Sequence, residues 1–310
     1  MQTVEALKHK IKNAEDLLSV VQTMKALAAV SIRHYEKAVA ALADYNLTVE
    51  LGLHILLRRQ KNLAVLTPPA ISNCMGAIVF GSDQGLCGQL NERIATYTID
   101  RLNGLHVHRA ERIVIAVGGR VAALLEEAGQ PVARTLPAPG SVAALTPLVQ
   151  DLLLQIDGWR RDRATDRIEL FYNQALTGVR YQPQRVPLLP LDLPWLQRLQ
   201  QTRWPARTLP TFTMPAEQLF SRLVRQHLFV TLYRACAEAV ATENASRLTA
   251  MQNAEKSIKE HLDDLQRRFH QQRQQSITAE LLDIVAGYEA IIGAQHRMPK
   301  YAVYKDPSPC

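Results

Sequence analysis

The glycine-rich turn Gly81–Gly88 (GSDQGLCG) is the segment of this sequence that most resembles a site for chemistry. It follows a short apolar run and precedes a helical pattern, which is where phosphate-binding loops lie in α/β proteins. However, it lacks the Lys-Ser/Thr ending of a P-loop, and its glycines do not have the GxGxxG spacing. Because glycines are common at strand–helix turns for backbone reasons alone, we expect a structural turn and no nucleotide or other cofactor.

Nucleophilic and metal-ligating residues do not form a recognisable set. Asp83 and Cys87 in the turn are candidate nucleophiles, but no histidine lies at a spacing that would pair with them. The four cysteines, Cys74, Cys87, Cys236 and Cys310, are scattered without a CxxC pair. The sequence therefore predicts no catalytic residue and no metal site, and we interpret the cysteines as buried or incidental thiols.

The formal net charge of +7 suggests an acidic partner, either nucleic acid or an acidic protein ring. The basic residues are dispersed, with the densest group at 160–163 (RRDR), and aromatic residues do not alternate with them as in single-strand binders. We therefore expect no nucleic-acid partner and no small-molecule substrate. A coiled-coil nucleic-acid binder and a doubly wound enzyme are the rival hypotheses, which a salt-dependent DNA titration and a nucleotide soak would separate.

The hydropathy of the chain does not predict a membrane span. No stretch approaches the roughly 20 uninterrupted apolar residues that cross a bilayer. The N-terminus is charged throughout and lacks the apolar region of a secretory signal. We therefore expect the protein in the cytosol, or on the cytosolic face of a membrane by way of partners.

The distribution of proline divides the chain into three parts. No proline precedes Pro68, and none lies between Pro215 and Pro299. Because proline is excluded from helix interiors, this pattern predicts a long helix at each end of a globular domain. The predicted parts are an N-terminal helix at 1–61, an α/β domain at 75–214, a C-terminal helix at 215–298 and a tail at 299–310.

The two proline-free flanks carry apolar residues spaced three and four apart, a pattern typical of coiled coils. The helices can pair antiparallel within the chain, which buries both seams without a partner, or each can bind another subunit. Of these alternatives we expect the antiparallel pair. The seam positions are Val4, Leu7, Ile11, Ala14, Leu18, Val21, Ala28, Ile32, Tyr35, Val39, Leu42, Val49, Leu53 and Leu56, and then Ile258, Leu262, Leu265, Phe269, Ile277, Leu281, Ile284, Tyr288 and Ile291.

The middle segment alternates between strand and helix patterns. Apolar runs at 77–80, 112–117 and 167–172 predict strands, and periodic segments at 90–102, 120–128 and 145–159 predict helices. Strands separated by helices of this length indicate a Rossmann-like parallel sheet. The proline-rich stretch at 181–215 is expected to hold a further extended strand and a linker to the last helix.

Four segments resemble one protein family, the gamma subunits of F-type ATP synthases. Residues 20–29 (VVQTMKALAA) resemble the family's ITxAMKMVAA run, and residues 82–91 (SDQGLCGQLN) resemble SDRGLCGGLN. Residues 243–254 (ENASRLTAMQNA) are similar to SEQAARMVAMKAAT, and residues 273–287 (RQQSITAELLDIVAG) to RQAxITQELTEIVGGA. The four segments occur in the family's order and spacing and span essentially the whole chain.

The resemblance implies a non-catalytic rotor. The paired terminal helices would form a shaft inside a hexamer of alpha and beta subunits, and the α/β domain would form a foot that binds the epsilon subunit and the membrane c-ring. Rotation would couple ion flow to ATP synthesis or hydrolysis at the beta subunits. The protein would lie on the cytoplasmic face of the bacterial inner membrane, peripheral through the complex.

The resemblance also assigns roles to single residues. Residues expected to contact the catch loops of the beta subunits lie on both helices, and residues of the glycine-rich turn belong to the foot. They are Met24, Lys25, Arg247, Arg273, Gln274 and Thr278 for the catch, and Ser82, Asp83, Gly85 and Gly88 for the turn.

The sequence departs from the family pattern in places. Gln84 replaces the usual arginine and Gln89 a glycine, and the chain continues from Tyr288 to Cys310 where the family usually stops. These departures suggest a divergent branch, such as the N-type rotary ATPases, and altered contacts at the foot.

Overall fold

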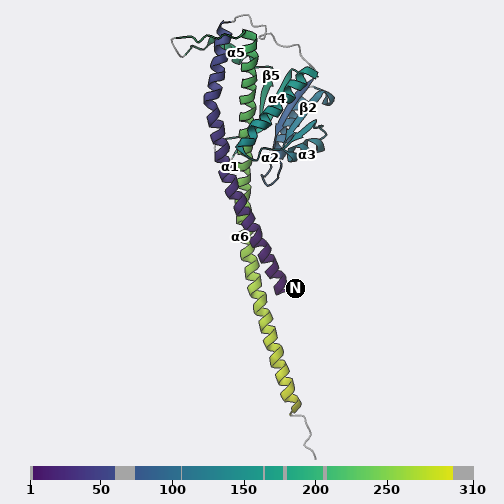
Figure 1. Cartoon of the computed structure of the whole chain (residues 1–310). Coiled ribbons are helices and arrows are strands. Elements are labelled where there is room, and N and C mark those ends of the chain that lie inside the picture. The colour runs from purple at the N-terminus through teal and green to yellow at the C-terminus, as the bar shows by residue number, and fades with distance from the viewer. Residues whose placement is uncertain are drawn as a thin grey trace, which may run out of the picture. The chain divides into compact units, whose positions relative to one another are not determined.

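The computed structural model describes residues 3–59, 74–105, 107–162, 165–176, 180–204 and 208–295 (Figure 1). By its internal contacts the chain forms two compact units, and each is described by itself. One comprises residues 22–253, and the other comprises residues 3–21 together with 254–295. In the described parts of the chain, none of the helices combines the length and the apolar composition that a membrane span requires.

Both proline-free flanks are helical, as predicted. Helix α1 spans Val4–Arg59 and helix α6 spans Ala216–Gln295, and each contributes to both units. The predicted helix ends at 60–61 and 296–298, and the tail at 299–310, lie outside the described residues.

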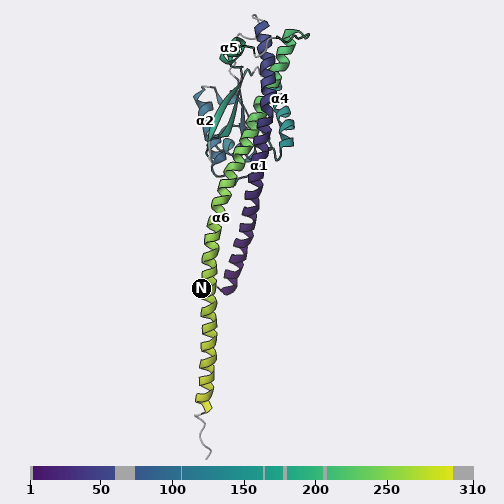
Figure 2. The same cartoon turned by 90° about the vertical axis from the view of Figure 1, so that its left-hand side faces the viewer.

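Within the unit of residues 22–253, α1 and α6 run antiparallel (Figure 2). The hydroxyl of Tyr45 donates a hydrogen bond to the side-chain oxygen of Gln226, at 2.8 Å. Further along α1, a Cβ at Gly52 would lie 2.9 Å from Leu223, which precedes Gln226 in α6. The sequence numbers of the partners thus rise on α1 as they fall on α6, and this confirms the predicted antiparallel pair.

The other unit holds the start of α1 beside a later part of α6. Leu7, Ala14, Leu262 and Leu265 are buried together there, and apolar neighbours complete the cluster, namely Ile11, Leu18, Ile258 and Phe269. These eight residues are all seam positions of the predicted coiled coil, so the heptad pattern is confirmed in this unit.

The prediction of a buried seam is wrong for the last part of α6. Ile277, Leu281, Ile284 and Tyr288 are between 48% and 68% exposed instead of buried. The physical reason is length, because the first turns of α1 already pack beside residues 258–269 and α6 continues to Gln295. The side chain of Ile291 lies outside the described side chains. Within this unit, α6 therefore presents an apolar stripe that α1 does not cover.

The middle of the chain folds as a sheet of mainly parallel strands, as predicted. In the described part of the chain the order is β3-β2-β1-β4-β5, in which the first four strands are parallel and β5 is antiparallel to β4. The strands are β1 (Met75–Phe80), β2 (Arg112–Val117), β3 (Arg134–Leu136), β4 (Arg167–Ala175) and β5 (Tyr181–Leu189).

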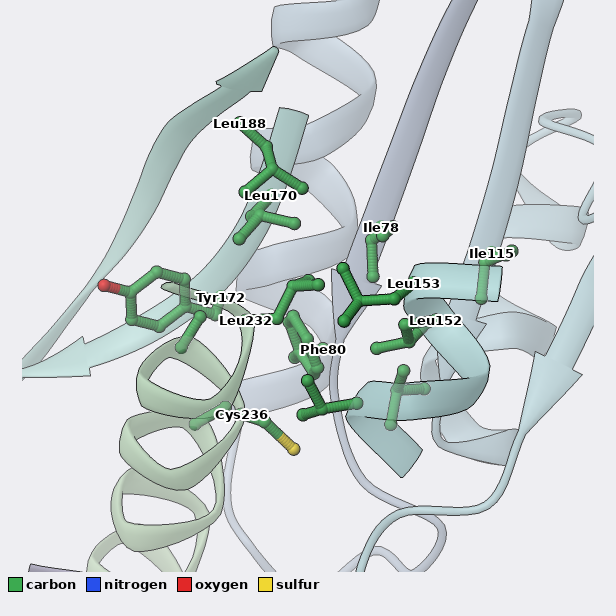
Figure 3. Packing of buried hydrophobic residues seen from close by; sticks show 14 of the residues in the cluster. Ile78, Phe80, Ile115, Leu152, Leu153, Leu170, Tyr172, Leu188, Leu232 and Cys236 are labelled. Carbon is green, nitrogen blue, oxygen red and sulfur yellow. The ribbon is translucent and has the colours of Figure 1, made fainter. Parts of the chain in front are cut away.

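Helices cover both faces of this sheet, which explains why its strands are apolar on both sides. Helices α2 (Leu90–Gly104) and α3 (Gly119–Glu127) pack on one face around Val79, Val114 and Phe171. Helix α4 (Leu145–Asp162) and the unit's part of α6 pack on the other face, and Figure 3 shows Leu152, Leu232 and Cys236 meeting the strands there. Short 3₁₀ helices lie at Arg109–Glu111 and Val142–Ala144.

The proline-rich stretch holds more structure than expected. Its predicted extended strand is β5, but a helix, α5 (Leu193–Gln201), follows where a linker was predicted. Pro194 lies in the first turn of α5, where its missing N–H costs no hydrogen bond. Leu196 of α5 is buried against the end of α1 and the start of α6.

Candidate functional site

The glycine-rich turn is held by its own hydrogen bonds. The backbone N–H of Ser82 donates to Oδ1 of Asn91 at 3.0 Å, and Nδ2 of Asn91 donates back to Oγ of Ser82 at 2.8 Å. Oγ of Ser82 in turn donates to the carbonyl of Gln84 at 2.6 Å. Ser82 is fully buried, so its hydroxyl is occupied in shaping the turn.

Asp83 ties the turn to two neighbouring loops. Its Oδ1 accepts the backbone N–H of Gly119, at the start of α3, at 2.8 Å, and its Oδ2 accepts the N–H of Ala138 at 2.9 Å. The N-terminus of a helix attracts anions, and at the start of α3 the chain's own carboxylate lies at that end. Asp83 therefore has a structural role, because it holds the turn to two other loops.

The two predicted glycines of the turn differ in what the backbone requires. Gly88 has a φ of 62°, which favours glycine. Gly85 is exposed, and a Cβ there would meet nothing within 4 Å. Leu86 between them has a φ of 62° and is 60% exposed. The turn therefore presents an apolar side chain outward.

The long helices contact the carboxyl edge of the sheet. The hydroxyl of Ser246 on α6 donates to the carbonyl of Cys87 at 2.6 Å, and the hydroxyl of Tyr35 on α1 donates to the carbonyl of Pro139 at 2.8 Å. Doubly wound sheets usually bind ligands at this edge. In this chain the loops at the carboxyl edge bind the chain's own helices α1 and α6. We call this contact between the long helices and the sheet domain the joint.

Glu238 is the residue of this joint that the sequence did not single out. One of its oxygens accepts hydrogen bonds from the hydroxyl of Tyr172 and from Nε2 of Gln174, each at 3.1 Å. The other accepts from Nε of Arg234 at 2.7 Å. Burial, and then the nearby Glu238 carboxylate, raise the pKa of Tyr172, so this phenol stays a donor. The sequence feature that could have indicated Glu238 is a single acidic residue among small apolar residues of α6.

Arg247, predicted to contact a beta subunit, is held within α6. Its guanidinium forms an ion pair with Glu243, one turn earlier, and its side chain is 16% exposed. Burial raises the pKa of Glu243, and the adjacent Arg247 opposes that rise. Met24 and Lys25 are half-buried on α1, in the same unit as Arg247.

The other predicted catch residues lie close together in the second unit. Arg273, Gln274 and Thr278 are exposed within a few residues on α6, and Oγ1 of Thr278 donates to the carbonyl of Gln274 at 2.9 Å. They are adjacent in sequence to the exposed apolar stripe that begins at Ile277. Polar and apolar side chains thus lie together on this part of α6, the composition of a protein-binding surface.

Within residues 3–59, 74–105, 107–162, 165–176, 180–204 and 208–295, no three His, Cys, Asp or Glu side chains are grouped so as to hold a metal ion.

Comparisons with known proteins agree with the family resemblance of the sequence. The family model described as ATP synthase matches residues 3–291. The ATP synthase gamma chain of Nostoc punctiforme is 26% identical over 318 residues, covering 94% of this chain and 100% of the relative. That of Cupriavidus pinatubonensis is 23% identical over 292 residues, with the same coverage.

Solved structures show the same fold. A chain of the Euglena gracilis mitochondrial ATP synthase (OSCP/F1/c-ring, rotational state 3) has a TM-score of 0.61 at 16% identity, covering 97% of this chain and 99% of that one. A chain from the central stalk and c-ring of the Tetrahymena thermophila enzyme has a TM-score of 0.54 at 18% identity, covering 76% of this chain and 99% of that one. With the family model matched along nearly its whole length, and with gamma chains as its relatives, this chain belongs to the ATP synthase family.

Proposed function

We propose that this chain is the gamma subunit of a rotary ATP synthase, the central-stalk rotor that couples ion-driven rotation to ATP synthesis or hydrolysis at beta subunits. The observation that carries the proposal is the apolar stripe at Ile277, Leu281, Ile284 and Tyr288. Exposed apolar side chains at helical spacing on a long helix need a partner surface. A hexamer of alpha and beta subunits that encloses the end of α6 supplies that surface.

The sheet domain is the part of the chain to which we assign the remaining partners, the epsilon subunit and the c-ring. The Tetrahymena neighbour is described as central stalk and c-ring, and the Euglena neighbour belongs to an assembly of F1 with a c-ring. By analogy we infer that this sheet domain is the foot that binds the epsilon subunit and the membrane c-ring. The chain would then be peripheral to a membrane through its complex, on the cytoplasmic face of the bacterial inner membrane, in keeping with its bacterial relatives.

The mechanism requires no catalytic group on this chain. A rotor acts on distant nucleotide sites only if its contacts with them differ between rotational positions, because a ligand shifts an equilibrium only by its differential affinity. Polar residues on one part of a helix make such contacts orientation-dependent. Arg273, Gln274 and Thr278 are exposed there, and we assign the beta-subunit catch to them together with Met24, Lys25 and Arg247.

Arg273→Ala combined with Gln274→Ala tests this assignment. We expect the variant to keep wild-type helicity and assembly, because exposed helix residues contribute little to stability. ATP turnover of the reconstituted complex should fall about tenfold or more, since charged hydrogen bonds contribute about 1.5–3 kcal/mol each. Turnover is measured after reconstitution with alpha and beta subunits.

The matched control for this variant is Gln266→Ala combined with Arg267→Ala, an exposed pair on the same helix. It removes the same two residue types beside the segment that α1 covers, and it should leave turnover unchanged. If the double variant at 273 and 274 turns over at the wild-type rate with full ion pumping, these residues do not carry torque.

A further inference from the structure

We propose that Glu238 is a positioning residue for coupling, whose carboxylate fixes the rotational register of α6 on the sheet domain. The inference rests on the proposed rotor function and identifies the contact through which torque crosses from sheet to helix. It concerns residues 22–253 alone, where α6 and the sheet pack as one compact unit.

One carboxylate at this contact receives three side-chain donors from two elements. Tyr172 and Gln174 of β4 donate to one oxygen, and Arg234 of α6 donates to the other. The side chain of Glu238 is only 15% exposed, and Tyr172 is 5% exposed. Water therefore competes poorly for the hydrogen bond from Tyr172. The bonds from Tyr172 and Gln174 cross from β4 to α6, so their geometry depends on where α6 sits relative to β4, whereas the bond from Arg234, which is 61% exposed, lies within α6 and holds the carboxylate in place.

The apolar contact of α6 with the sheet includes small side chains close to Glu238, namely Ala235, Cys236 and Ala239, together with the larger Leu228, Leu232 and Val240. The small side chains provide few knobs to interlock beside Glu238, and apolar burial has no preferred direction. Figure 3 shows Tyr172 beside α6 at the margin of the cluster that contains Leu232 and Cys236. The hydrogen bonds from Tyr172 and Gln174 to Glu238 then add directional contacts that resist slipping of α6 on the sheet, beside the bond from Ser246 to the carbonyl of Cys87.

Glu238→Gln isolates this role because it preserves size. The amide keeps one acceptor oxygen and turns the other into a donor, so either Arg234 or the pair of Tyr172 and Gln174 faces a donor instead of an acceptor. The helix still packs on the same apolar surface. Misaligned positions of α6 on the sheet should therefore become more populated, while the fold persists.

The assembled complex in sealed vesicles provides the functional test. We measure ATP turnover and the number of ions moved per ATP against a series of opposing ion gradients. For Glu238→Gln we expect turnover within about twofold of wild type, but at least about a twofold loss of ions per ATP at the steepest gradient, because torque then slips at the joint. Tyr172→Phe should act in the same direction, and the double variant should be no worse than the stronger single one.

The matched control is Leu232→Val, which alters the buried apolar contact of the same helix. We expect this control to transport as many ions per ATP as the wild type, even if it lowers the urea midpoint of unfolding as much as Glu238→Gln does. A loss of coupling in the control equal to that of Glu238→Gln would reduce Glu238 to a structural residue and overturn the proposal. Wild-type ion transport by Glu238→Gln at every gradient would also overturn it.

A second measurement on the isolated chain separates this inference from the proposed function. Spin labels are placed at the exposed Glu127 of α3 and Arg222 of α6, with Cys74 and Cys310 replaced by serine. Glu238→Gln should broaden the distribution of distances between the labels, and an unchanged distribution contradicts the proposal. If the wild-type chain restores no ATP turnover to the complex, the rotor function fails, and the label distances still decide the role of Glu238 in the joint.

Discussion

Gly118→Ala is expected to destabilise the chain strongly. Gly118 joins β2 to α3 with a φ of 114°, a region that L-residues rarely adopt. A Cβ there would lie 2.7 Å from the carbonyl carbon and oxygen of Ser82. These are backbone atoms of the hydrogen-bonded turn and cannot turn aside. We expect a loss of about 3 kcal/mol or more in the free energy of unfolding, measured by urea denaturation.

The control for Gly118→Ala is Gly140→Ala. A Cβ at Gly140 would meet nothing within 4 Å, so this change should alter the free energy of unfolding by less than about 0.5 kcal/mol or slightly stabilise the chain. Equal stabilities for the two variants would show that the loops at the carboxyl edge are looser than the structure describes. The joint proposed for α6 would then have no rigid base.

Leu281→Asp combined with Ile284→Asp is expected to have the largest effect on function. These side chains are 57% and 68% exposed in the chain, so charging them should leave its unfolding transition nearly unchanged. In a complex that buries them, two unpaired carboxylates would have to lose their water, at several kcal/mol each. We expect the variant to fold but to lose assembly with alpha and beta subunits, with ATP turnover falling about a hundredfold or more.

Leu281→Met combined with Ile284→Leu provides the matched control for this variant. It keeps both positions apolar at similar volume, and it should retain assembly and turnover. Co-purification and turnover by the complex are measured for both variants. If the aspartate variant assembles normally, the stripe is not the surface that a hexamer encloses, and the main support for the rotor function is lost.

The long helices and the main strands could be predicted because their signals are local. Proline is excluded from helix interiors wherever the helix packs, and buried parallel strands need continuous apolar runs. The three-residue strand β3 carries no such run, and it forms because it hydrogen-bonds to β2. Helix α5 was missed because proline suggests a linker, although proline is well accommodated in a first turn.

The location of the site could be predicted where a sequence motif exists. The contacts and exposure of its residues could not be predicted where they depend on segments far away in the sequence. The turn could be located from its glycines, but nothing in the sequence indicates that Asp83 accepts N–H groups from two distant loops. The seam at Ile277 and Leu281 has the same heptad spacing as the buried one, and only the relative lengths of α1 and α6 decide which part is covered. Arg247 is a different case, because its spacing from Glu243 already favours an ion pair along the helix.

If this chain turns within a ring of partner subunits, its rotation can be observed in a single complex. The chain, with Cys74 and Cys310 replaced by serine, is labelled with a bead at a cysteine introduced at Glu127, an exposed position of α3, and is assembled with alpha and beta subunits fixed to a surface. On addition of ATP, we expect continuous rotation in one direction that stops when ATP is removed. Sustained ATP hydrolysis by the assembled complex without any rotation of the bead would contradict it.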